Sequence, residues 1–248
     1  TGLLPADDLG SWGWRIPFAF GLLVGLTGFM IRSGTKAEER DQPPSSHDPV
    51  SAPVGEVLRN HRPALLRTIA CNILNGVGFY LTFVYLTSYL VDYVKFTESR
   101  ALTINTSVMV VFMLLLPIVG YLADRIDRRT ILLFGSGGVA LFALPMFWLV
   151  HHPDPVMVIL GQLGMAVILT AFFAPLMAAM VGQFPVSVRV TGYSIGYNIP
   201  LALFGGTAPL FATYLIDKTH LQLAPAFYMI AAGLLAFVVI WFMPSEDG

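Results

Sequence analysis

The chain has 248 residues, of which 56% are hydrophobic and 12% are charged, and its formal net charge is −1. Soluble domains carry about 25% charged residues, so this chain has too few charges to cover a surface that faces water. The balanced charge excludes nucleic-acid binding through an overall positive field. The single cysteine, Cys71, excludes an internal disulfide and a cysteine-based zinc site. The composition therefore indicates an integral membrane protein.

Hydrophobic stretches that are long enough to cross a bilayer recur along the whole chain. A bilayer core of roughly 30 Å requires about 20 apolar residues in helical form. Apart from Arg15, at the start of the first stretch, none of these stretches contains an acidic or basic residue. A charge at the centre of such a helix would cost about 2.5–3.5 kcal/mol. We predict an all-α membrane protein with about seven spans, which cover residues 14–31, 68–90, 101–122, 130–150, 156–180, 190–215 and 223–243.

A long polar stretch, residues 33–62, separates the first span from the other six. Prolines among Ser, Asp and Glu predict an irregular early part. From Pro53 onward, Val54, Val57, Leu58 and Leu65 keep helical spacing, which predicts an amphipathic helix on the membrane surface.

Lys and Arg residues gather in alternate connections, namely those after the first, third and fifth predicted spans. Connections rich in these residues stay in the cytoplasm, so we predict that the first residues lie outside and the C-terminal tail lies inside. The chain begins at Thr1 in a connection, with no leader sequence. An outside start of this kind is expected if an odd number of helices precedes it, so we expect the chain to be a C-terminal fragment.

The connection between the third and fourth spans has the densest charge pattern. Gly120 would allow two helices to approach closely, and Asp124 would end a helix at the cytoplasmic surface. The arginines can pair with acids or with the C-terminal carbonyl groups of a neighbouring helix, which would hold the cytoplasmic side closed. A short loop kept inside by positive charge is the alternative. We assign gating roles to Gly120, Asp124, Arg125, Arg128, Arg129 and, before the sixth span, Arg189.

The segment from Gly120 to Arg129 resembles the Gly-x-Leu-x-Asp-Arg-x-Gly-Arg-Arg/Lys loop of the major facilitator superfamily, although Asp127 stands where the family usually has Gly. That family carries the loop between its second and third helices and again between its eighth and ninth. With one span before the linker and six after it, the copy here would be the second. The resemblance implies helices six to twelve of a twelve-helix transporter: residues 1–32 as the last helix of the N-terminal half, 33–67 as a central cytoplasmic linker, and 68–248 as the six-helix C-terminal half.

Two further stretches resemble the metabolite:proton symporter branch of that family. Residues 13–18 match its Gly-Trp-Arg-Ile-Pro-Phe signature, and residues 184–192 match its Phe-Pro-x-x-Val-Arg-x-Thr-Gly stretch at the eleventh helix. The branch includes transporters of proline and betaine, 2-oxoglutarate, citrate and shikimate. Gly182 stands where the branch usually has Glu, which removes one possible partner of the loop arginines.

The resemblance implies a secondary active transporter that couples a small organic acid, amino acid or betaine to protons by symport and alternating access. It implies a multi-pass protein of the plasma (inner) membrane. Its expected partners are the substrate, protons, membrane lipid and the missing N-terminal helices. We expect no nucleic acid, no cofactor and no metal.

Polar and aromatic residues deep in the spans are the candidates for substrate contact, because such transporters bind near the bilayer midplane. In the second span, Asn72 and Asn75 share one helical face. Amides can bind a carboxylate, and tyrosine faces can bind a quaternary ammonium by cation–π attraction. The alternatives are hydrogen bonds between helices or, near a span end as at Tyr193, an interfacial aromatic belt. The predicted substrate-binding residues are Asn72, Asn75, Tyr80, Asn105, Gln162, Tyr197 and Asn198.

Proton coupling requires a titratable group within the membrane, and the spans offer no acid at depth. His151 and His152 are expected to be solvated in an outer loop. We therefore expect the coupling acid on the missing N-terminal helices.

Other function classes stay open with less support. A uniporter or exporter of the same fold fits the spans equally well, and a seven-helix receptor fits the outside N terminus. The sequence contains no phosphate-binding loop, zinc-binding helix motif or nucleophile elbow, so we predict that the protein is not an enzyme.

Overall fold

The computed structural model describes residues 8, 11–15, 18–19, 21–22, 25–30 and 52–243. The chain divides into two compact units, Thr1–Pro49 and Val50–Gly248. In the first unit, the short 3₁₀ helix η1 covers Gly13–Arg15, and residues 18–19, 21–22 and 25–30 are helical. The rest of the predicted first span, most of the predicted linker and the tail at 244–248 lie outside the described residues.

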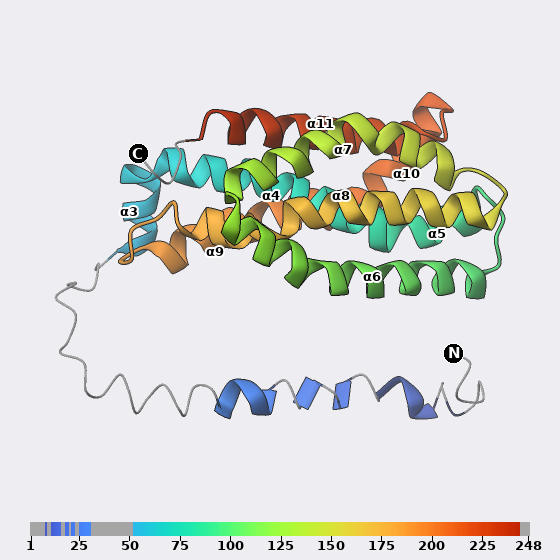
Figure 1. Cartoon of the computed structure of the whole chain (residues 1–248), viewed down its shortest axis with the longest axis horizontal. Coiled ribbons are helices and arrows are strands. Elements are labelled where there is room, and N and C mark those ends of the chain that lie inside the picture. The colour runs from blue at the N-terminus through green and yellow to red at the C-terminus, as the bar shows by residue number, and fades with distance from the viewer. Residues whose placement is uncertain are drawn as a thin grey trace. The chain divides into compact units, whose positions relative to one another are not determined.

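The second unit is a bundle of long helices that run back and forth along one axis, while the short helix α3 crosses the bundle at one end (Figure 1). Its elements in chain order are α3 (Pro53–Asn60), α4 (Arg62–Phe79), the π-helical turn η2 (Tyr80–Tyr85), α5 (Leu86–Asp92), α6 (Glu98–Arg125), α7 (Arg128–Val150), α8 (Pro155–Val181), α9 (Arg189–Pro200), the π-helical turn η3 (Leu201–Gly205), α10 (Ala208–Thr219) and α11 (Ala224–Trp241).

Six helices in the described part of the chain are long and apolar enough to cross a membrane. They are Arg62–Asp92, Glu98–Arg125, Arg128–Val150, Pro155–Val181, Arg189–Thr219 and Ala224–Trp241. They correspond to the second to seventh predicted spans, which confirms an all-α, multi-pass membrane protein. Most of these helices run past the predicted edges, because polar residues beyond the apolar stretch continue the same helix. Apolar side chains also point outward from the bundle, such as that of Val190, which is 79% exposed.

The predicted amphipathic helix is present as α3, where Val57 is fully buried and Val54 and Leu58 are exposed. Val57 packs in a small cluster with Leu65, Phe184 and other residues of α4 and the segment before α9. The prediction was wrong in placing Leu65 on this helix. The helix is interrupted at His61, between α3 and α4. Pro63 lies in the first turn of α4, where the backbone N–H that proline lacks would have no partner within the helix.

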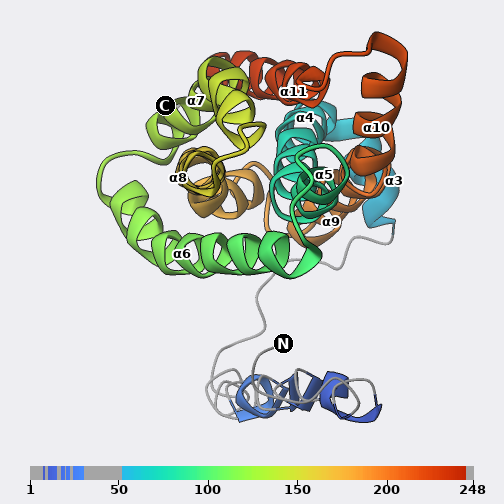
Figure 2. The same cartoon turned by 90° about the vertical axis from the view of Figure 1, so that its right-hand side faces the viewer.

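Helices α7, α8 and α11 pack through glycines that bring backbones into contact. A Cβ atom added to Gly135 on α7 would lie 2.5 Å from the backbone nitrogen of Phe172 on α8. One added to Gly233 on α11 would lie 3.1 Å from the backbone nitrogen of Ala140 on α7. Small residues allow such approaches because no side chain stands between the two backbones. Membrane helices depend on this close van der Waals packing, since lipid provides no hydrophobic force between them. Figure 2 shows these three helices grouped on one side of the bundle.

Helix α4 crosses η3 at a pair of glycines. A Cβ atom on Gly76 would lie 3.1 Å from the Cα of Gly205. Both helices that meet here contain a π-helical turn: the N–H of Leu86 donates to the carbonyl of Leu81, and the N–H of Gly206 donates to that of Leu201, five residues back in each case. Such turns are often found at functional sites. The crossing therefore places η3 against α4, with Gly205 next to Tyr80 at the start of η2.

Candidate substrate cavity and cytoplasmic loop

A cavity of about 580 Å³ lies between the helices Arg62–Asp92, α6, α8 and Arg189–Thr219. Its lining residues lie between the middle of the bundle and the end that holds the Gly120–Arg129 loop. Aromatic side chains dominate the lining: Phe79, Tyr80, Phe112, Phe173, Tyr193 and Tyr197.

The aromatic rings contact one another around this wall. Phe79 and Tyr80 meet edge to face with ring centroids 5.9 Å apart, and Phe112 meets Phe173 edge to face at 5.8 Å. On α9, Tyr193 and Tyr197 stack at 5.7 Å. Aromatic pairs in these geometries add about 0.5–1.5 kcal/mol beyond their buried area, so the wall is held in shape by its own contacts.

Among the described residues that line the cavity, Asn75 is the only one with an amide side chain. Its Nδ2 donates to Oδ1 of Asn72 at 3.3 Å, and Nδ2 of Asn72 donates to the carbonyl of Thr68 at 2.9 Å. Asn72 is fully buried behind Asn75. Of these two predicted residues, Asn75 borders the cavity, and Asn72 orients its amide.

Asn105 and Gln162 come together, but they do not line this cavity. Nε2 of Gln162 donates to Oδ1 of Asn105 at 2.7 Å and to the carbonyl of Thr82 at 3.0 Å. Nδ2 of Asn105 donates to the carbonyl of Phe83 at 2.9 Å. Both amides are buried and bind the backbone of the π-helical turn η2. This is the helix-to-helix role that the sequence left open as the alternative.

Tyr80 and Tyr197 line the cavity as two of its aromatic residues, whereas Asn198 does not. The Asn198 side chain is exposed, and its Nδ2 donates to the carbonyl of Ser194 on its own helix at 2.8 Å. Tyr193, for which an interfacial belt was the alternative, stands in the cavity wall.

The sequence did not single out Phe112 and Phe173, which complete the aromatic wall. In spans that are apolar on every side, helical periodicity does not distinguish a cavity face from a lipid face. The available signal was a cluster of aromatic residues at equivalent depths in four spans, which requires the helix pairing to be known.

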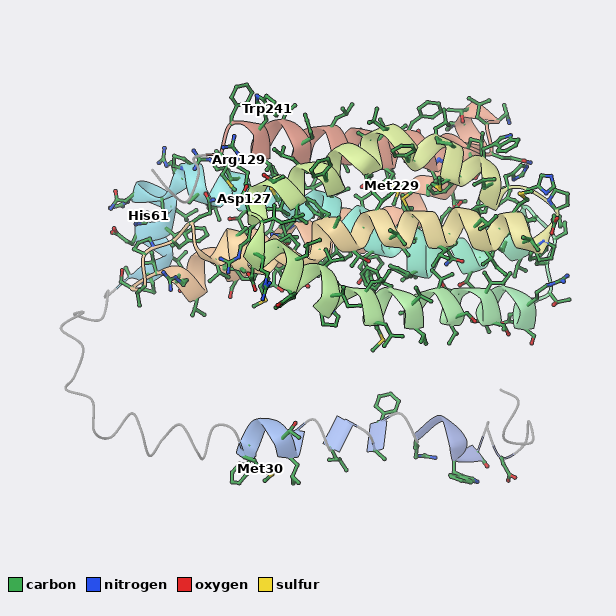
Figure 3. The ribbon with its side chains drawn as sticks, in the orientation of Figure 1. Met30, His61, Asp127, Arg129, Met229 and Trp241 are labelled. Atoms are coloured by element: carbon green, nitrogen blue, oxygen red, sulfur yellow. The ribbon has the colours of Figure 1, made fainter. Side chains whose placement is uncertain are left out.

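At the loop-bearing end, the predicted arginine contacts are present in part. Arg128 Nη2 lies 2.8 Å from Oδ1 of Asp124. Arg129 donates from Nε to the carbonyl of Ile240 at 3.2 Å and from Nη2 to that of Trp241 at 2.6 Å. Arg129 therefore caps the C-terminal end of α11. Figure 3 shows Arg129 and Trp241 at this end of the bundle. A cation at a helix C terminus is stabilised by the helix dipole.

The other residues with predicted gating roles have different surroundings. Arg125 lies over the Tyr121 ring at 4.6 Å, and Nε of Arg189 donates to the carbonyl of Phe184 at 3.1 Å. A Cβ atom on Gly120 would meet nothing within 4 Å among the described residues. Within the described bundle, Gly120 therefore makes no close helix approach.

Asp127, which departs from the family pattern, caps the N terminus of α7. Its carboxylate accepts from the backbone N–H of Thr130 at 2.8 Å, from that of Arg129 at 3.3 Å and from the hydroxyl of Thr130 at 2.7 Å. Burial raises the pKa of this carboxyl, but the hydrogen bonds outweigh it, so the pKa of Asp127 lies below its usual value. A negative charge here also suits the positive end of the helix dipole.

The second departure, Gly182, is exposed and has ordinary helical backbone angles at the end of α8. The neighbouring Gln183 accepts from Arg67 of α4 at 3.3 Å, and its Nε2 lies 2.9 Å from the sulfur of Met243 beyond α11. Gln183 thus links the ends of three spans at a place where the family usually has a nearby acid.

At the opposite end of the bundle, His151, predicted to be solvated, is half-buried and contacts Tyr89. The hydroxyl of the fully buried Tyr89 lies 3.0 Å from Nδ1 of His151 and donates to the carbonyl of Gln222 at 3.1 Å. The contact joins α5 to the connection before α8 and to the connection before α11. His152 is half-buried, and its Nδ1 accepts from the N–H of Asp154. Nearby, burial together with the carboxylates of Asp217 and Asp92 raises the pKa of Tyr93.

No group of three or more His, Cys, Asp or Glu residues in the described part of the chain is arranged to hold a metal ion.

A membrane bundle in which four spans enclose an aromatic cavity, and whose loop ties neighbouring helix ends together, has the architecture of half a solute transporter. The profile of the Major Facilitator Superfamily matches residues 9–197 and 68–248, and the chain belongs to this family. The two matched ranges together reach from residue 9 to the end of the chain.

Curated relatives that match this chain carry transporter names. A "Putative proline/betaine transporter" of Staphylococcus aureus is 31% identical over 249 residues, which cover 98% of this chain and 53% of the relative. The "Ectoine/proline transporter ProP" of Corynebacterium glutamicum is 31% identical over 260 residues, which cover 100% of this chain and 51% of the relative. The "Glycine betaine/proline/ectoine/pipecolic acid transporter OusA" of Dickeya dadantii is 27% identical over 245 residues, with 94% and 48% covered.

The chain spans about half the length of the curated relatives that it matches. No solved structure matches it. The predicted membership of the major facilitator superfamily is confirmed, and the relatives agree with its metabolite:proton symporter branch.

Proposed function

We propose that the complete protein is a proton-coupled symporter of small zwitterions with a quaternary or secondary ammonium group, such as glycine betaine or proline. This chain would supply the C-terminal half of the transporter, with residues 33–67 as the linker between the halves. The other half, the substrate, protons and membrane lipid are its partners.

The aromatic cavity is the observation that carries this proposal. The described lining residues include six with aromatic rings and one with an amide, and none of them is an acidic or basic residue. A ring face attracts a cation with about 2 kcal/mol or more when both are desolvated, and a quaternary ammonium fits this attraction because it loses no hydrogen bonds. A free carboxylate with no cationic partner would gain nothing from such a wall.

The carboxylate of a zwitterion requires a hydrogen-bond donor in the same space. Asn75 is placed for this role because it borders the cavity. Its Nδ2 carries two hydrogens, and the amide donates one hydrogen bond, to Asn72 at 3.3 Å. Asn75 would bind the carboxylate while the rings of Tyr80 and Tyr197 face the ammonium group. The relatives, whose names include betaine, proline and ectoine, fit a substrate of this charge pattern.

Proton coupling would come from outside this bundle. In the described spans, the acidic residues lie at or beyond helix ends, as do Asp92, Asp124 and Asp217, and none borders the cavity. Intramembrane acids serve as proton relays in transporters, so we propose that the coupling acid belongs to the N-terminal half.

We further propose that the Gly120–Arg129 loop faces the cytoplasm and the end of the bundle with His151 faces outward. The concentration of arginines at the loop-bearing end supports this orientation. The Arg128–Asp124 and Arg129–α11 contacts would keep this half rigid while it rocks against the other half. A membrane-impermeant thiol reagent tests the orientation. A cysteine at Ile126 should react only in inside-out vesicles, and one at Lys95 only in right-side-out vesicles; the reverse pattern would overturn it.

Uptake by the full-length protein in proteoliposomes tests the function. We expect radiolabelled glycine betaine and proline to exchange in counterflow, and an imposed inward proton gradient to drive net accumulation that an uncoupler abolishes. Exchange without any proton dependence would indicate a uniporter, and accumulation driven only by an outward gradient would indicate an exporter. Absence of exchange for every betaine, amino acid and carboxylate tested would overturn the proposal and reopen the seven-helix receptor.

A further inference from the structure

The π-helical turn η2 is held from outside by two amides on different spans. Asn105 on α6 binds the carbonyl of Phe83, and Gln162 on α8 binds that of Thr82. The two amides also bind each other at 2.7 Å. Three spans therefore meet in one hydrogen-bonded cluster, and each contact to η2 goes to its backbone.

We propose that Asn105 and Gln162 are positioning residues, which hold η2 in its π-helical form and so aim the aromatic wall at the substrate. This inference rests on the proposed function and adds to it the residues that set the shape of the site. Neither residue lines the cavity, so they would act through the backbone of η2.

The hydrogen bonds of Gln162 fix the position of a backbone carbonyl, but they leave buried polar atoms without partners, which lowers the stability of the fold. Both hydrogens of its Nε2 are used, while its Oε1 and the Oγ1 of Thr82 are buried with no partner among the described residues. A buried polar atom without a partner costs about 1–3 kcal/mol, and an apolar residue of the same shape would avoid that cost. The amide at this position is thus explained by where it holds the carbonyl of Thr82.

The backbone that the amides hold carries the aromatic wall. The Phe83 ring lies 5.4 Å from that of Phe79 and 4.8 Å from that of Phe112, and both of these partners line the cavity. Tyr80, at the start of η2, lines it directly. A π turn closes its hydrogen bond over five residues, and an α-helical turn over four. If η2 relaxed to α-helix, the side chains on one side of the turn would rotate by about 100°, the angle per residue, relative to those on the other side. Without the amides, Tyr80 and Phe83 would turn relative to α6 and α8.

A labelling experiment tests this step without reference to transport. Tyr80→Cys is introduced into the full-length protein in which every native cysteine, including Cys71, has been replaced, and its reaction rate with a water-soluble maleimide is measured. We expect Gln162→Met and Asn105→Leu each to slow labelling by at least about threefold, the factor for an average hydrogen bond between membrane helices. Thr170→Val is the matched control. Thr170 is equally buried on α8, but its hydroxyl bonds only to the carbonyl of Ala166 on its own helix, so the rate should be unchanged.

Transport kinetics provide the second measurement. For glycine betaine, Gln162→Met should raise KM about three- to tenfold with Vmax within about twofold, because a smaller fraction of the protein has the wall in place. A merely structural role would lower the thermal midpoint and the amount of active protein and leave KM unchanged.

The outcomes separate this inference from the proposed function. Unchanged labelling in both amide variants, or slowed labelling with an unchanged KM, overturns the inference and leaves the function standing. Slowed labelling in a protein that transports no zwitterion supports the positioning role and overturns the function. If Gln162→Met does not fold, Asn105→Leu decides alone by the same measurements.

Discussion

Helix α8 has two faces that illustrate two ways of packing membrane helices. Phe172 is fully buried with its backbone against Gly135 of α7, whereas the next residue, Phe173, borders the cavity. On the first face, glycines bring α7, α8 and α11 into backbone contact. On the second, aromatic side chains from four spans line a cavity of about 580 Å³.

The comparison indicates that stability and binding are assigned to different sides of the bundle. Backbone contact allows no added atom, so that side should tolerate little change, and it lies away from the proposed binding cavity. The ring-lined side has spare volume and few hydrogen bonds, so changes there should alter affinity before stability. The following variants of the full-length protein test this division, in order of expected effect.

Gly135→Ala should have the largest effect, and it should be on stability. The added Cβ would lie 2.5 Å from the backbone nitrogen of Phe172, so the two helices must separate along their contact. Overpacking of this kind costs about 1–3 kcal/mol or more, which should appear as a lower thermal midpoint in detergent. Gly55→Ala is the control, because its Cβ would meet only the Cβ of Ala52 at an ordinary 3.9 Å. Equal midpoints for the two variants would contradict the tight packing of α7 on α8.

Tyr197→Ala should reduce affinity with little loss of stability. Loss of a cation–π contact worth about 2 kcal/mol corresponds to about a 30-fold rise in KM for glycine betaine. Tyr197→Phe keeps the ring and should remain within about threefold. Tyr214→Ala removes a ring that is 52% exposed and stacks on Phe211 outside the cavity, so uptake should be unaffected. A similar KM for Tyr197→Ala and wild type would remove the aromatic cavity as the binding site.

Arg129→Ala should lower stability moderately. The guanidinium holds two terminal carbonyls of α11, and a hydrogen bond to a charged group contributes about 1.5–3 kcal/mol when buried, so we expect about 1 kcal/mol at this half-buried position. Arg125→Ala is the comparison, because Arg125 is exposed and covers only the Tyr121 ring of its own helix. The thermal midpoint should fall more for Arg129→Ala. The opposite order would show that the α7–α11 contact does not stabilise the bundle.

Asp127→Ala should have the smallest effect, about 1 kcal/mol for a lost N-cap, and the effect should depend on pH. The pKa of Asp127 is lowered in the folded protein, so its contribution is complete above the usual carboxyl pKa of about 3.9 and is lost as the pH falls through the lower folded value. Asp127→Asn keeps a capping oxygen but cannot titrate. Thermal midpoints of wild type and Asp127→Asn should therefore converge in acid. A constant difference down to pH 3 would exclude titration of this cap.

The spans could be predicted from the sequence because each depends on a local property, the length of an uncharged apolar stretch. For the loop arginines, the sequence predicted contacts with acids or with helix-terminal carbonyls. It did not predict that Arg128 pairs with Asp124, because α6 ends at Arg125 and α7 begins at Arg128, so the two residues are not on one helix. The partner of Arg129 was predicted only as a kind of group, a helix-terminal carbonyl. That it belongs to Trp241 and Ile240, more than a hundred residues away, required the arrangement of helices.

For the polar residues within the spans, the sequence predicted the chemical group but not its surroundings. Asn75 and Gln162 both read as amides deep in apolar spans, yet Asn75 borders the cavity and Gln162 binds the backbone of η2. The amide group alone does not distinguish these surroundings. Phe112 and Phe173 were passed over because a phenylalanine in an apolar span has no periodic contrast with its neighbours.

The sequence by itself determined the class of protein, the number of described spans and the family, because hydropathy and short charged motifs are properties of contiguous residues. Only the tertiary structure decided which rings face a common space and which amides brace a helix. Those roles depend on helix rotation and pairing, which small residues such as Gly76, Gly135 and Gly205 set by how closely two backbones can approach.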